Sequence, residues 1–125
     1  FLPSKKRYVK NNDFNFLKFK YLKVKYKNNN PFNSILNHPF LLRKEKQVQL
    51  FYPPKNRLLT ITTSYPSVVI YSNGYDTELK VKDTGICFEC QHLPNDINFK
   101  SNPLSLLKNG NDYSHFIKFK FSSFK

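Results

Sequence analysis

The chain has 125 residues, enough for one modest domain, and its 17% aromatic content consists of phenylalanine and tyrosine alone. This composition argues against a disordered chain and favours strands. No apolar run reaches the ~20 residues of a membrane-spanning helix, and none resembles a signal peptide. The net charge of +13 comes mainly from lysine, with arginine only at Arg7, Arg43 and Arg57, so we attribute it to compositional drift rather than to nucleic-acid binding.

The first 30 residues predict little regular structure beyond one alternating segment. Residues 1–13 are polar and basic and are typical of a loop or an edge segment. Between residues 14 and 26, aromatic or aliphatic side chains alternate with lysine, and the alternation changes phase midway. Such a slip predicts a β-bulge or a turn between two short strands, and a solvated face explains the lysines. The run Asn28-Asn29-Asn30-Pro31 then interrupts the pattern.

The middle of the chain predicts closely spaced short strands. Turn residues separate them at Pro53-Pro54, at Tyr65-Pro66 and at Ser72-Asn73-Gly74. The predicted strands are residues 39–42, 47–52, 58–63 and 67–72, followed by a brief strand at 78–82.

The last third predicts two more strands. One spans about residues 85–92 and ends before Pro94, because proline cannot donate to a strand ladder. Asn109-Gly110 indicates a turn, and residues 113–121 alternate as a final strand. Short strands with turns between them, and no convincing helix, predict an all-β antiparallel sandwich.

Glu89 is the first candidate for chemistry. Side chains alternate along a strand, so Cys87, Glu89 and Gln91 share one face and Phe88, Cys90 and His92 the other. An isolated carboxylate on so apolar a strand is costly unless it is paired, exposed in a cleft or needed for a reaction. From the strand alone, an exposed residue or one half of an ion pair with lysine is the favoured alternative.

Cys87 and Cys90 form a C-x-x-C pair that predicts neither a metal site nor a redox site. Zinc would need two further ligands, and a redox pair would need a strand-to-helix turn. Because the two side chains point to opposite faces, we interpret them as packing cysteines of a reducing cytoplasm.

The segment around Glu89 resembles the C-terminal signature of the galactose mutarotases (aldose 1-epimerases). That pattern reads Glu-x-Gln-x-x-Pro-Asp-x-x-Asn, and Asn95 stands in place of its Asp, with Asp96 one position later. Further stretches match the family in order: Phe1-Leu2-Pro3, Asn37-His38-Pro39-Phe40-Leu41-Leu42 (Asp-His-Pro-Phe in the family), Leu59-Thr60-Ile61-Thr62-Thr63, Val69-Ile70-Tyr71, and the closing segment from Pro103 to Tyr113.

The resemblance implies an incomplete galactose mutarotase-like supersandwich, with residues 1–125 as the C-terminal part of a single domain whose N-terminal part is absent. It implies interconversion of the α and β anomers of galactose or a similar aldose, with Glu89 as general base and no cofactor. The family's acid is a histidine from the N-terminal part, and no histidine here matches its motif. The isolated chain is therefore expected to be inactive.

The resemblance also implies that Asn37 and Gln91 contact the monosaccharide. Asn37 can hydrogen-bond sugar hydroxyls but lacks the charge of the family's Asp, and Gln91 could instead serve strand pairing. We interpret His92 as a packing or surface residue, His115 as a core-facing polar residue, and Asp96 with Asn98 as turn caps. Two alternatives remain: a carbohydrate-binding mutarotase-like protein without turnover, and a basic β module that binds polyanions.

Overall fold

The computed structural model describes residues 16–18, 36–76, 81–98 and 105–123, with only the backbone described for 73–76 and 81–84. The predictions for residues 1–13, for the Asn28–Pro31 break and for most of the alternating segment 14–26 lie outside this part of the chain. So do the short Phe1-Leu2-Pro3 match and residues 78–80 of the brief strand.

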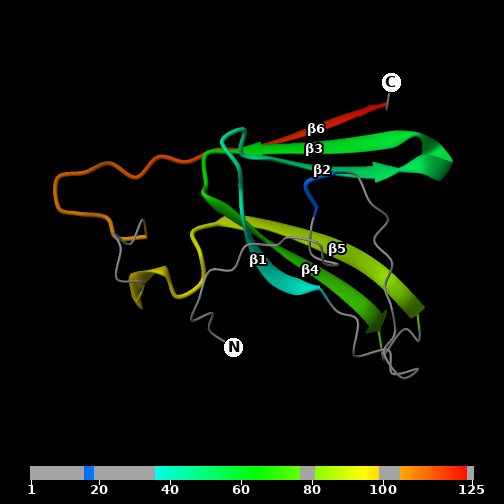
Figure 1. Ribbon diagram of the computed structural model, residues 1–125, viewed down its shortest axis with the longest axis horizontal. Coiled ribbons are helices and arrows are strands. Elements are labelled where there is room, and N and C mark those ends of the chain that lie inside the picture. Colours follow the sequence, from blue (N-terminus) through cyan, green and yellow to red (C-terminus); the bar gives the residue numbers. More distant parts are fainter. Residues whose placement is uncertain (1–15, 19–35, 77–80, 99–104, 124–125) are drawn as a thin grey trace.

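The described residues form six strands in two antiparallel sheets, which confirms the all-β prediction (Figure 1). One sheet has the strand order β1-β4-β5 and the other has the order β2-β3-β6. The strands are β1 (Asn37–Leu41), β2 (Gln47–Tyr52), β3 (Arg57–Thr63), β4 (Ser67–Asp76), β5 (Val81–Gln91) and β6 (Ile117–Ser123).

Two short 3-10 helices are the only helical elements in the described ranges: η3 (Pro53–Lys55) and η4 (Asp96–Asn98). Neither is long and apolar enough to span a bilayer. The helix η3 closes the β2–β3 hairpin, where Asn56 adopts a left-handed conformation with φ of 48° and donates its N–H to the carbonyl of Pro53.

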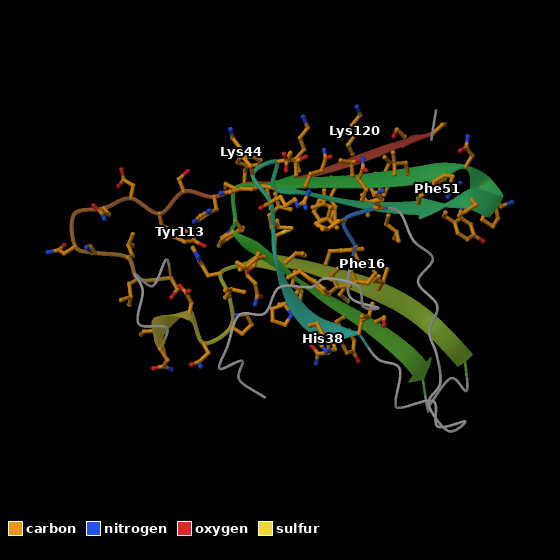
Figure 2. All side chains as sticks on the ribbon, viewed as in Figure 1. Phe16, His38, Lys44, Phe51, Tyr113 and Lys120 are labelled. Carbon is orange, nitrogen blue, oxygen red and sulfur yellow. The ribbon has the colours of Figure 1, made fainter. Side chains whose placement is uncertain are left out.

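The two sheets lie one above the other, and the hydrophobic core lies between them (Figure 1). Ile61 of β3 and Val68 of β4 are each 1% exposed, and Cys90 of β5 packs with them. Phe16 also lies between the layers (Figure 2), where its ring meets Phe40 edge to face at 5.5 Å. The sheets are joined directly by the tight connection between β3 and β4, which allows apolar residues from both strands to pack against each other.

Several predicted element boundaries are wrong. β4 does not turn at Ser72-Asn73-Gly74 but continues to Asp76, and a register shift between Asn73 and Tyr75 absorbs the irregularity. A strand can accommodate an extra residue as a bulge, so turn-forming residues need not end it. The last strand begins at Ile117 rather than at Tyr113.

Candidate functional site

The outer face of the β1-β4-β5 sheet brings Asn37, Glu89 and Gln91 together. In the antiparallel register, Asn37 pairs with Tyr71, Val69 pairs with Glu89, and Ser67 pairs with Gln91. Directly paired residues project from the same face, and residues two apart along a strand share that face. The three residues singled out in the sequence therefore point to the side of the sheet turned away from the core.

Asn37 and Glu89 stand on opposite edges of this sheet with β4 between them. β1 and β5 each pair with β4, so the two residues lie two strand spacings apart, about 10 Å across the sheet. They are also offset along the strands, because Asn37 pairs with Tyr71 whereas Glu89 pairs with Val69, two residues away on β4. Between them, Val69 and the half-buried Tyr71 form the floor, and Val69 is 8% exposed.

Glu89 and Asn37 are exposed on this face, and Gln91 is half-buried. Within the described residues the Glu89 carboxylate makes no hydrogen bond or ion pair, so the ion pair with a lysine that the sequence left open is not seen there. The carboxylate and the Gln91 amide lie on the same side of one strand, with one residue between them.

The end of β5 is fixed by Ser67 and by the turn that follows. Ser67 is fully buried, and its hydroxyl donates a 2.6 Å hydrogen bond to the backbone carbonyl of Gln91. Beyond the strand, Asn95 adopts a φ of 63°, and the buried Asp96 accepts a 3.0 Å hydrogen bond from the backbone N–H of Ser105. Asp96 thus ties the η4 turn to the segment that leads toward β6.

A cluster of four rings, which the sequence did not predict, joins the ends of both sheets. The ring of His115 stacks on Tyr65 at 4.1 Å, and the rings of Tyr113 and His92 approach His115 edge-on at 5.0 and 5.3 Å. The hydroxyls of Tyr65 and Tyr113 are hydrogen-bonded to each other. The interpretation of His92 as a packing residue is consistent with these contacts.

The interpretation of His115 as a core-facing strand residue is wrong. His115 is exposed and precedes β6, and its Nδ1 lies 2.9 Å from the hydroxyl of Ser64. The backbone explains the difference, because Phe116 exchanges hydrogen bonds with Ser64 and accepts one from the Thr63 hydroxyl at 2.8 Å. These contacts hold the segment as an extended connection before ladder pairing begins at Ile117.

The chemistry available on the outer face is that of a carboxylate with neighbouring amides. Glu89 can accept a proton, and the side chains of Asn37 and Gln91 can both donate and accept hydrogen bonds. The histidines in the described ranges do not share this face: His38 alternates away from Asn37, while His92 and His115 belong to the ring cluster. In the same ranges no group of three or more His, Cys, Asp and Glu residues is placed to hold a metal ion.

Comparisons with known proteins match the chain to one family. The model of the family described as aldose 1-epimerase matches residues 2–120. Among curated proteins, the galactose mutarotases of Mus musculus and Homo sapiens are each 31% identical over 98 residues, and that of Bos taurus is 34% identical over 98 residues. The alignments cover 69% of this chain but only 29% of each of these relatives. No solved structure matches the chain.

Proposed function

Because the chain belongs to the aldose 1-epimerase family, we propose that it supplies the base-bearing, C-terminal part of an enzyme that interconverts the α and β anomers of galactose or a similar aldose. The observation that carries the proposal is the shared outer face of Asn37, Glu89 and Gln91. A carboxylate flanked by two amides suits a substrate whose recognition depends on hydroxyl groups.

In the proposed reaction, Glu89 takes the proton of the anomeric hydroxyl. Ring opening needs a base at this hydroxyl and an acid at the ring oxygen, and reclosure on the other face gives the second anomer. Asn37 and Gln91 hydrogen-bond sugar hydroxyls and so hold the anomeric carbon near the carboxylate. The acid comes from outside the described face, since that face holds no histidine among the described residues.

The test is polarimetry of freshly dissolved α-D-galactose with the natural full-length gene product and its Glu89→Gln variant. Losing a general base should lower kcat by about 10²- to 10⁴-fold while sugar affinity changes little. Glu45→Gln is the matched control, because Glu45 is an exposed carboxylate in the turn between β1 and β2. An unchanged rate in the Glu89 variant would remove Glu89 from the mechanism.

A carbohydrate-binding protein without turnover is the second candidate, and Asn37 is the residue that favours it. The amide can bind a hydroxyl but cannot provide the stronger, charge-assisted hydrogen bond of a carboxylate. This alternative expects no rate above the spontaneous one in any variant and a sugar affinity that is the same before and after Glu89→Gln.

The free thiols of Cys87 and Cys90 accord with our proposal of a cytoplasmic location.

A further inference from the structure

The strand β6 has an unpaired edge in the described part of the chain. It is the last strand in the order β2-β3-β6, so only its β3 side is hydrogen-bonded there. An edge strand presents backbone N–H and C=O groups that can template another strand. Natural edges are usually shortened, bent or covered, but β6 pairs regularly with β3 over all seven of its residues.

The two faces of β6 differ sharply in chemistry. Phe119 pairs with the core residue Ile61, and Phe121 pairs with Leu59, so the face that carries these phenylalanines is turned toward the other sheet. Even so, Ile117, Phe119 and Phe121 are 43%, 53% and 78% exposed. Inward-facing apolar area on β6 is therefore left open.

The other face of β6 is basic. Lys118 and Lys120 are exposed and pair with Thr62 and Thr60 of β3. Figure 2 shows Lys120 on the side of its sheet turned away from β4 and β5. A strand added along this edge would therefore meet phenylalanine on one face and lysine on the other.

The lysines argue against a second copy of the chain as the added strand. If two β6 strands paired antiparallel with Phe119 opposite Phe119, Lys118 of each copy would lie opposite Lys120 of the other, which makes two lysine pairs. If the pairing were centred on Lys120 instead, the Lys120 residues of the two copies would lie opposite each other. Like charges directly opposite each other destabilise a strand pair, whereas opposite charges stabilise it. The net charge of +13 adds to the repulsion between copies.

We propose that β6 pairs with a β-strand in which apolar and acidic side chains alternate, supplied by the part of an aldose 1-epimerase polypeptide that lies outside the aligned segment. The alignments cover only 29% of each relative, so such a polypeptide has ample length to supply the strand. Its apolar side chains would cover Phe119 and Phe121, and its carboxylates would face Lys118 and Lys120. The inference goes beyond the proposed catalysis and does not depend on Glu89.

The test is fluorescence anisotropy with labelled seven-residue peptides, the length of β6. A peptide alternating valine and glutamate should bind the chain saturably. A valine–lysine peptide should bind about tenfold more weakly or not at all, because two favourable charge pairs become unfavourable. A valine–glutamate peptide N-methylated at its ladder-forming amides should fail to bind, which separates strand pairing from simple charge attraction.

The double variant Lys118→Glu, Lys120→Glu should reverse the preference between the two peptides. Its matched control is Lys44→Glu with Lys108→Glu, which makes the same charge change at exposed positions outside the strands and should keep the original preference. Equal binding of the acidic and basic peptides, or no saturable binding of either, would overturn the proposal. So would a dimer in sedimentation that Phe119→Glu disperses, because the occupant would then be a second copy.

Discussion

Cys87 and Cys90 belong to the same strand but should react very differently. Cys87 is exposed on the outer face beside Tyr71, whereas Cys90 is 8% exposed in the core. Burial raises the pKa of the Cys90 thiol, and a hydrogen bond with Thr63 lowers it by a smaller amount. Since the thiolate is the reactive form, we expect a thiol reagent to label one cysteine rapidly in the native chain and the second only on unfolding.

Mass spectrometry of the labelled peptides checks this assignment. Cys87→Ser should abolish the fast phase, and Cys90→Ser should leave it. The raised pKa also has a consequence for stability: the unfolded chain loses the Cys90 proton near its ordinary value of about 8.5, before the folded chain does. The free energy of unfolding should therefore fall as pH rises above that value, and Cys90→Ser should remove this component. Equal labelling rates would contradict the burial of Cys90.

At the level of single residues, alternation along one strand was enough to place Glu89 and Gln91 together, but not to add Asn37. Asn37 reaches the same face because β1 pairs with β4 rather than with its neighbour β2. Strand partners are chosen by packing of the whole molecule, which a local pattern does not encode. The prediction that His115 faces the core was wrong for a related reason. An extended loop alternates its side chains just as a strand does, so the alternation alone did not show that His115 precedes β6.

Among the elements, the β2–β3 hairpin depends on the left-handed conformation of Asn56. Asparagine tolerates this region, whereas a β-branched residue does not. Asn56→Val should lower the free energy of unfolding by about 1–3 kcal/mol, and Asn56→Gly should change it little, as measured by urea denaturation. Lys55→Val is a control, because it places the same side chain one position earlier at the end of η3. Equal losses in the two valine variants would mean that the turn conformation is not the cause.

Strand positions were easier to predict than strand ends. The prediction for residues 47–52 coincides with β2 (Gln47–Tyr52), where turn residues bound the apolar pattern at Pro53. The strand with Glu89 was predicted to begin at about residue 85, but β5 begins at Val81. Its first residues continue the pairing with β4 past the register shift, as the partners Tyr75 and Lys82 show. A strand extends as far as its neighbour offers a partner, whatever its own composition.

On the scale of the whole molecule, the two sheets form a sandwich with a small core. Among the described residues, the buried hydrophobic side chains are Ile61, Val68, Val69 and Cys90, while Phe116, Phe119 and Phe121 are each more than half exposed. Val69 lies on the outer face, so its buried side chain forms part of the floor of the candidate site and does not fill the space between the sheets. The fold therefore places the candidate site on one outer face and leaves apolar area exposed along β6.

Because the described outer face lacks an acid, we predict that the 125-residue chain alone does not accelerate mutarotation. Its described outer face holds the proposed base Glu89 and two amides but no histidine to act as the acid at the ring oxygen, and mutarotation needs both an acid and a base. Polarimetry of fresh α-D-galactose should give the same rate with the chain, with its Glu89→Gln variant and with buffer. Sugar-induced NMR shifts confined to the outer face, near Tyr71 and Gln91, would show that the chain is folded and that its site is formed. A rate above buffer that Glu89→Gln removes would mean that these residues contain the acid as well as the base.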